Sequence, residues 1–208
     1  MHLRAFVFDI GGVLIDFDFD KIVAKIAGGD PAVMRRANLL RTDPSLIEAE
    51  SGRMRGVDYF LDKIRPLAPH WTYDDFVHAW ADVLTPNQKG QMLLRAVQEA
   101  GYRVFFLSNA AEYNVDAMNF KFPGFLSQPV GCFVSWRMGM VKPDVAIYEA
   151  VAHQINVEAS NCLFLDDVQD NVDAARKAGM TPLLFSTREI AEVRRKISRL
   201  TDKRVPPT

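Results

Sequence analysis

The sequence is poor in cysteine, has no excess of charge of either sign and contains no long apolar run. Only Cys132 and Cys162 occur, both among apolar neighbours, so we expect free buried thiols and no disulfide. The 25 Lys and Arg residues nearly balance the 26 Asp and Glu residues, so bulk charge gives no indication of nucleic-acid binding. Spanning a bilayer takes roughly 20 apolar residues. No run approaches that length, so we expect no membrane partner.

The sequence also has no internal repeat, no low-complexity tract and no leader-like start. A strand pattern begins almost at once, in LRAFVFD (3–9), without the charged and then apolar segment that is typical of a signal peptide. We therefore expect a cytoplasmic protein. Its length fits one large domain, or a core domain with a smaller insertion. Nothing in the sequence indicates its oligomeric state.

Short apolar runs that end in polar side chains are the strongest pattern present. Runs without polar alternation are typical of strands that are buried on both faces of a parallel sheet. The polar ends are Asp9 after AFVF, Ser108 and Asn109 after VFFL, and Asp166 and Asp167 after CLFL. A fourth run, PLLF (182–185), has no polar end.

Helical patterns separate these runs, over 86–100, 143–154 and 171–178, and glycines follow the first and third of them. Alternation of strands and helices predicts an α/β fold, with a Rossmann-like open parallel sheet and helices on both faces. In such sheets ligands bind outside the carboxyl ends of the strands. The polar strand ends should therefore meet at one site.

A long helix-rich segment, residues 17–85, separates the first run from the second. Its apolar residues recur at spacings of three and four, as in amphipathic helices. The segment is too long for one crossover connection. We predict an α/β core made of residues 1–16 and 86–208, with an inserted helical cap of residues 17–85 over the strand ends.

The residue types at the strand ends suit phosphate and a divalent cation. Glycines beside Asp9 allow backbone N–H groups to turn toward an anion. Lys142 precedes Pro143, a suitable first residue for a helix. Adjacent acids at Asp166 and Asp167 are costly unless a positive charge lies nearby, and Mg²⁺ fits where phosphate is present. Each feature alone has an ordinary structural explanation, but together they indicate a functional site.

Four segments, FDIGGVL, FLSNA, GMVKPD and FLDDVQDNVDAARKAG, resemble in order and spacing the four motifs of the haloacid dehalogenase-like (HAD) hydrolase family. The insertion resembles the helical cap of the first type (C1) of that family. Within the family, the opening motif and the DDxxxN ending resemble the subgroup of sugar-phosphate phosphatases that includes α-glucose-1-phosphatase.

The resemblance implies an enzyme in which Asp9, Ser108 and Lys142 are catalytic. Asp9 would attack phosphorus and form an aspartyl-phosphate that water then hydrolyses. Ser108 and Lys142 would hold the oxygens of the transferring phosphoryl group. The residues that would line the phosphate site are Gly11, Gly12, Ser108, Asn109 and Lys142.

The resemblance also implies Mg²⁺ as the cofactor. Its ligands would be the carboxylates of Asp9 and Asp167 and the backbone carbonyl of Gly11, with Asp166 acting through water. Asn171 would orient Lys142 or the acidic loop. The favoured hypothesis is a magnesium-dependent phosphatase whose partner is a small phosphorylated metabolite such as a sugar phosphate.

Gly11 departs from the family pattern. Most phosphatases of the family carry a second Asp there, which protonates the leaving group and then activates water, help worth roughly 10² to 10⁴-fold. One explanation is a substrate with a good leaving group, such as an anomeric sugar phosphate. Another is a cap residue, either Glu50 as acid or Arg41 as an electrostatic substitute. The third is lost turnover in a protein that binds a phosphorylated metabolite or a partner.

A further enzyme hypothesis is displacement of halide from a 2-haloacid by Asp9. That reaction needs no magnesium and would gain nothing from paired acids at Asp166 and Asp167. The remaining acids of this region, Asp16, Asp18 and Asp20, alternate with apolar residues. We predict that they form the polar face of a short ribbon and take no part in catalysis.

Overall fold

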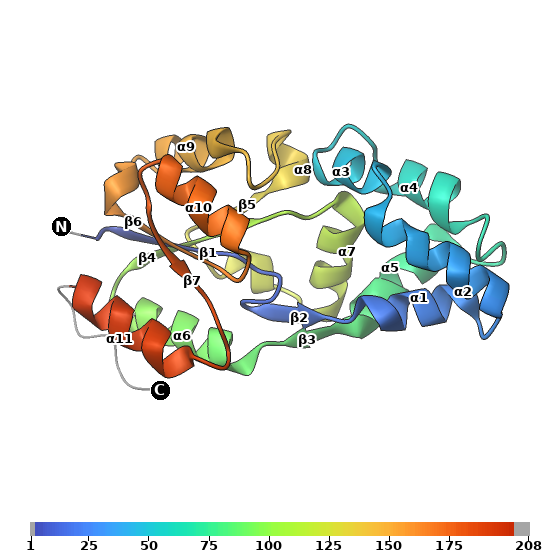
Figure 1. The fold of residues 1–208 in the computed structure, drawn as a ribbon, viewed down its shortest axis with the longest axis horizontal. Helices are drawn as coiled ribbons and strands as arrows, with labels where there is room; N and C mark the ends of the chain where they lie inside the picture. The colour runs from blue at the N-terminus through green and yellow to red at the C-terminus, as the bar shows by residue number, and fades with distance from the viewer. Residues whose placement is uncertain (1–2, 202–208) are drawn as a thin grey trace.

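The structure, a computed structural model that describes residues 3–201, is built around a five-stranded parallel sheet (Figure 1). The order across the sheet is β5-β4-β1-β6-β7. Its strands are β1 (Ala5–Phe8), β4 (Arg103–Ser108), β5 (Gly131–Val134), β6 (Cys162–Asp166) and β7 (Thr181–Leu184). This arrangement confirms the predicted α/β fold with a Rossmann-like open sheet. The predicted core extends to residues 1–2 and 202–208, which lie outside the described residues.

The strands at the centre of the sheet end level with one another. β1 pairs with β4 on one side and with β6 on the other, so that Phe8 lies opposite both Phe106 and Leu165. Residues that follow these strands therefore share one edge of the sheet. The chain order reverses at β1, and α/β sheets bind ligands at such a point.

Helices cover both faces of the sheet because successive side chains of a strand point to opposite sides. Phe6 and Phe8 pack with side chains of α6 and α11, whereas Ala5 and Val7 pack with side chains of α9 and α10. The helices of this part are α6 (Gln88–Glu99), α7 (Glu112–Lys121), η3 (Phe125–Ser127), α8 (Ser135–Met138), α9 (Val145–Gln154), η4 (Ala159–Asn161), α10 (Gln169–Lys177) and α11 (Ile190–Leu200).

Two helices begin later than the proline pattern predicts. α6 begins at Gln88 because Asn87 caps it, accepting a hydrogen bond from the N–H of Gly90 at 3.0 Å. α9 begins at Val145 because Asp144 accepts from the N–H of Ala146 at 3.0 Å. The expectation that Pro143 opens a helix is therefore wrong: a capping side chain defines each start.

The segment between β1 and α6 carries the remaining helices of the described residues, which lie beyond one edge of the sheet (Figure 1). At its base, β2 pairs antiparallel with β3, and Asp16 lies opposite Thr85. Its elements are β2 (Ile15–Phe17), α1 (Phe19–Ala27), α2 (Pro31–Asn38), η1 (Leu39–Thr42), α3 (Ser45–Glu50), α4 (Gly56–Tyr59), η2 (Phe60–Ile64), α5 (Tyr73–Val83) and β3 (Leu84–Pro86). We propose that residues 17–85 act as the cap.

The cap packs on α7 of the core through aromatic rings. Tyr113 of α7 stacks on Tyr59 with ring centroids 5.2 Å apart and lies against Phe76 at 5.0 Å. Phe76 is fully buried, as expected for a core residue. The cap and the sheet are therefore joined by one continuous apolar cluster.

The acids at the start of the cap have separate structural roles. Asp16 of β2 accepts a hydrogen bond from the Asn87 side chain at 3.0 Å. Asp18 caps α1 by accepting from the N–H of Lys21 at 3.1 Å, and Asp20 forms an ion pair with Arg41. The prediction of one polar ribbon face is wrong for Asp18 and Asp20, because the strand ends at Phe17 and α1 follows.

The two cysteines take part in no disulfide in the structure. Cys132 and Cys162 are both free thiols, and burial raises the pKa of each to about 11. They therefore stay protonated at neutral pH. Within residues 3–201, no helix has both the length and the apolar character that crossing a membrane requires.

Candidate active site

A buried lysine joins two of the strand ends. The Nζ of Lys142 lies 2.8 Å from Oδ1 of Asp9 and 2.7 Å from Oδ2 of Asp166, and all three side chains are almost fully buried. Nζ also lies 3.3 Å from the carbonyl oxygen of Leu107, at the end of β4. One cation is therefore held among the ends of β1, β4 and β6.

Asn109 positions Lys142 through its backbone. Its Nδ2 donates to the carbonyl of Lys142 at 2.9 Å, and its Oδ1 accepts from the N–H of Lys142 at 2.8 Å. Both ends of the amide are thereby used. Asn109 therefore holds the lysine segment in place, and its predicted place in the phosphate site stays a prediction, since one N–H of the amide remains unused by these bonds.

The charges of this cluster depend on one another. Burial alone would lower the pKa of Lys142, but the carboxylates of Asp9 and Asp166 outweigh it and raise that pKa above its ordinary value. Burial raises the pKa of Asp9, and the charge of Lys142 opposes this rise. The pKa of Asp9 is raised to about 7 by burial even beside the lysine, and the charge of Lys142 favours the ionised form of this carboxyl.

Only one oxygen of Asp9 is occupied. Oδ1 accepts from Nζ of Lys142 and from the N–H of Ile10 at 2.7 Å, and the backbone N–H of Asp9 donates to the carbonyl of Leu165 at 2.8 Å. None of the hydrogen bonds among the described residues reaches Oδ2. The carboxylate is therefore held by one oxygen and leaves the other for a ligand or an electrophile.

Asp166 is held by its surroundings on both oxygens. Asn171 donates from Nδ2 to Oδ1 at 3.0 Å and to Oδ2 at 3.1 Å, and the N–H of Val168 donates to Oδ1 at 2.9 Å. The side chain of Asn171 thus contacts the acidic loop and not Lys142. Asp166 orients the lysine, and direct metal ligation would have to displace one of these donors.

Asp167 faces outward over the glycine turn. One oxygen atom from each of Asp9, Asp166 and Asp167 lies within 4.8 Å of the others, a set of hard oxygen donors that suits Mg²⁺. Burial, followed by the charge of Asp166, raises the pKa of Asp167. The pKa values of Asp9 and Asp167 are both raised. A bound dication would lower them again, because it stabilises the charged form of each carboxylate.

Gly12 is required by this geometry. Its φ is +69°, and a Cβ there would lie 2.1 Å from Oδ2 of Asp167. Gly11 is different, because its φ lies outside the left-handed region and a Cβ would meet only the ring of Phe17 at 3.6 Å. Neither backbone conformation nor space excludes an acid at position 11.

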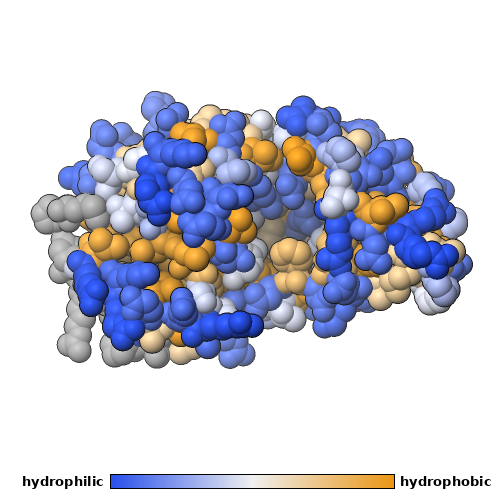
Figure 2. Space-filling model, viewed as in Figure 1, coloured by the Kyte–Doolittle hydropathy of each residue, from blue (hydrophilic) through white to orange (hydrophobic). Residues whose placement is uncertain are grey.

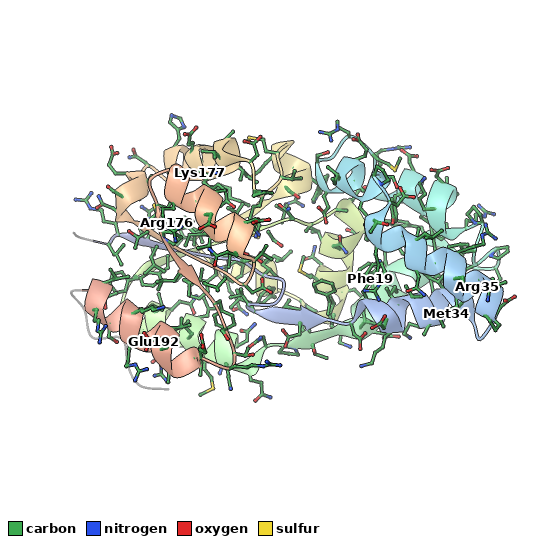
Figure 3. The ribbon with its side chains drawn as sticks, viewed as in Figure 1. Phe19, Met34, Arg35, Arg176, Lys177 and Glu192 are labelled. Atoms are coloured by element: carbon green, nitrogen blue, oxygen red, sulfur yellow. The ribbon has the colours of Figure 1, made fainter. Side chains whose placement is uncertain are left out.

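A cavity of about 360 Å³ extends from this edge of the sheet toward the cap. Gly11, Ser108 and Asn109 line it from the core. The space-filling view shows the molecule hollowed where its two parts meet (Figure 2). Phe19, another lining residue, lies at the end of the cap nearest the sheet, whereas Arg35 lies at the far end (Figure 3).

The cap contributes Arg41 and Glu50 to the cavity. Arg41 forms an ion pair with Asp20, and its guanidinium lies 4.4 Å from the ring centroid of Phe19. The positive charge of Arg41 is therefore partly offset by the carboxylate of Asp20. The carboxylate of Glu50, by contrast, accepts no hydrogen bond from any residue in the described range 3–201. Burial raises the pKa of Glu50, and the charge of Lys142 partly opposes this.

A buried serine fixes Glu50 to the core. Ser135, which is fully buried after β5, donates from Oγ to the backbone carbonyl of Glu50 at 2.6 Å. The same Oγ accepts from the N–H of Ala110, just beyond β4, at 3.0 Å. Ser135 is a site residue that was not predicted from the sequence. The sequence pattern of the strand before Ser135 is weak, because GCFV begins with glycine and most of it is only partly buried.

The matching family model is that of the haloacid dehalogenase-like hydrolases, over residues 3–179. The chain belongs to this family and is a hydrolase of it, as its motifs predicted. A phosphatase of Mycobacterium tuberculosis is 29% identical over 88% of either chain. A D-ribitol-5-phosphate phosphatase of Bacteroides thetaiotaomicron is 26% identical, covering 85% of this chain and 89% of its own.

A sesquiterpene phosphatase of Aspergillus oryzae is 33% identical, but the match covers 48% of this chain and 50% of that protein. Among solved structures, a HAD family enzyme from Bacteroides thetaiotaomicron in complex with magnesium and inorganic phosphate superposes with a TM-score of 0.72. It is 23% identical, over 88% of this chain and 94% of that chain. That likeness shows the shared fold.

Proposed function

We propose that this protein is a magnesium-dependent phosphatase that hydrolyses a small phosphate monoester through an aspartyl-phosphate. The observation that carries the proposal is the buried lysine held between Asp9 and Asp166 at 2.8 and 2.7 Å. This arrangement leaves Oδ2 of Asp9 as the nucleophile. Phosphatase names among relatives that match most of the chain support the same reaction.

A carboxylate that approaches a phosphate needs compensating charge. At about 4 Å the repulsion is roughly 4 kcal/mol at an effective dielectric constant near 20, which would slow the reaction on the order of a thousandfold. Lys142 supplies one positive charge, and Ser108, at the end of β4, supplies a hydroxyl. Mg²⁺ would be held by Asp9, Asp167 and the carbonyl of Gly11, and it would supply the second positive charge.

The reaction would proceed in two steps. Oδ2 of Asp9 forms a bond to phosphorus while the bond to the ester oxygen breaks, and the departing oxygen takes a proton from Glu50. Water then attacks the aspartyl-phosphate, the Glu50 carboxylate accepts a proton from that water, and phosphate and free Asp9 are released. Glu50 thus replaces the acid that is absent at Gly11. Its raised pKa suits a proton donor.

Phosphate release from p-nitrophenyl phosphate, with and without Mg²⁺, tests the proposal beside the variant Asp9→Asn. We expect release that requires Mg²⁺ and is lost in the variant. If Mg²⁺ binds by calorimetry but no ester is hydrolysed, the protein binds phosphorylated metabolites without turning them over. Release of halide from a 2-haloacid without Mg²⁺ would instead support the dehalogenase alternative.

A further inference from the structure

The cavity beside the proposed nucleophile is mostly apolar. Arg41 and Glu50 are the only charged side chains among the described residues that line it, and Arg41 forms an exposed ion pair with Asp20. Its walls are formed largely by aromatic and aliphatic side chains, namely Ile10, Ile15, Phe17, Phe19, Trp80 and Met118. At about 360 Å³ the space has the size of a small-molecule pocket.

The polar groups of the wall are largely committed to the protein. Asn109 uses both ends of its amide on the backbone of Lys142. Oδ1 of Asn114 accepts from the N–H of Ala111 at 3.1 Å, and the ring of Tyr113 stacks on that of Tyr59 with centroids 5.2 Å apart. Few polar side-chain groups of the wall therefore remain for a ligand rich in hydroxyl groups, chiefly Glu50, the amide nitrogen of Asn114 and Nε1 of Trp80, which has no hydrogen-bond partner among the described residues.

Phe17 extends the apolar wall of the cavity to Gly11, two residues after the proposed nucleophile Asp9. It is 54% exposed, and its Cε1 lies 3.6 Å from where a Cβ of residue 11 would be. A large aromatic side chain is thus left uncovered beside the position from which an acid is missing. Together with the other apolar residues of the cavity, Phe17 gives the apolar lining that is usual in small-molecule pockets.

We propose that this cavity binds the organic part of an apolar phosphate monoester, aliphatic or aromatic, and that the protein hydrolyses such esters in preference to sugar and polyol phosphates. The proposal rests on the phosphatase function proposed above and names its substrate class. It replaces the sugar phosphate favoured from sequence, because each hydroxyl buried without a partner weakens binding by roughly tenfold.

A matched pair of substrates tests this class directly. Pentyl phosphate and ribitol 5-phosphate both release a primary five-carbon alcohol and differ in hydroxyl content. We expect kcat/KM to be at least about a hundredfold higher for pentyl phosphate, since several hydroxyls would be buried unpaired. Equal values, or a preference for ribitol 5-phosphate, would overturn the substrate class. Activity on p-nitrophenyl phosphate that is lost in Asp9→Asn would still support the phosphatase, so the two proposals fail separately.

A pair of phenylalanine variants tests the wall. Phe17→Gln should raise KM for pentyl phosphate roughly tenfold and leave KM for ribitol 5-phosphate within about twofold. Phe120→Gln is the control, because Phe120 is 58% exposed and does not line the cavity. Thermal melting of both variants checks folding. An unchanged KM in a folded Phe17→Gln protein would exclude Phe17 from the substrate wall.

Discussion

The hydroxyl of Ser135 donates to the backbone carbonyl of Glu50 at 2.6 Å and accepts from the N–H of Ala110 at 3.0 Å. One buried side chain of the core thereby holds the end of α3 in the cap. Because Glu50 is the acid proposed to protonate the leaving group, this bond positions it over the strand ends.

Ser135→Ala should misplace that acid. We expect kcat for pentyl phosphate to fall about tenfold or more, because small displacements of a catalytic group are costly. The rate with p-nitrophenyl phosphate, whose leaving group needs no proton, should change little. Ser51→Ala is the control, since its hydroxyl is also buried but bonds only within the cap, to the carbonyl of Glu48. Equal losses with both substrates would indicate a general structural defect.

Glu50→Gln should remove the acid and change the pH profile. In the unaltered protein, kcat for pentyl phosphate should fall as pH rises through the raised pKa of Glu50, because the donor must be protonated. The variant should lose this limb and on the order of 10²-fold in kcat. The same raised pKa means that the folded state holds its proton more tightly, so this carboxyl stabilises the fold below its unfolded pKa. That contribution is lost as pH rises through the folded pKa. A high-pH limb that persists in the variant would exclude Glu50.

Gly12→Ala should abolish metal binding at the site. The new methyl carbon would lie 2.1 Å from Oδ2 of Asp167, so this carboxylate would have to leave its present position. Gly28→Ala is the matched control, since Gly28 also has a positive φ, +55°, but nothing lies within 4 Å of its Cβ. Both should lose roughly 1–2 kcal/mol of unfolding free energy through strain. Calorimetry with Mg²⁺ should show lost affinity only in Gly12→Ala, and equal affinity in both would contradict the proposed ligands.

Lys142→Met should destabilise the fold as well as end catalysis. It leaves the buried carboxylates of Asp9 and Asp166 without their cation, which costs about 3–5 kcal/mol. The loss should grow as pH rises, because burial raises the pKa of Asp9 and its carboxyl becomes charged only above that pKa. Urea unfolding measures it, beside Lys25→Met, which breaks an exposed ion pair with Asp82 and should cost at most about 1 kcal/mol. Similar small losses for both would mean that the buried cluster is not charged.

Gly11→Asp tests whether Glu50 does the work of the missing acid. The position has room for a side chain and no left-handed φ, so the variant should fold. In a Glu50→Gln background it should recover about tenfold or more of kcat for pentyl phosphate, whereas Gly11→Asn should not. Failure of the aspartate to restore any rate would show that proton donation does not limit turnover.

The sheet and the meeting of its polar ends were predictable from local pattern. AFVF, VFFL and CLFL are uninterrupted apolar runs, and parallel strands place their carboxyl ends at one edge. Asp9, Ser108 and Asp166 therefore had to approach one another. The starts of α6 and α9 were predicted two residues early, because the prolines at 86 and 143 were taken as helix openers and the capping Asn87 and Asp144 were overlooked.

Other parts of the site depend on contacts between distant segments. Asn109 is predicted from sequence to line the phosphate site, and in the structure its side-chain amide makes two hydrogen bonds to the backbone of Lys142. Ser135 and Glu50 are 85 positions apart, and neither belongs to a polar strand end that pattern could detect. The apolar character of the cavity was also not predicted. In the sequence, Phe17, Phe19 and Trp80 resemble ordinary core residues of the cap, and only the packing of the cap on the sheet places them in the cavity wall.

The fold class, the family and the residues gathered at the strand ends follow from local sequence, because the period of apolar residues and the order of short motifs specify them. Tertiary structure alone decided which of those residues are free to act. The charges of Asp9 and Asp166 raise the pKa of Lys142, and burial raises that of Glu50. Among residues 3–201, no hydrogen bond reaches Oδ2 of Asp9. Such effects depend on distances of a few ångströms between segments far apart in the chain, which no local pattern encodes.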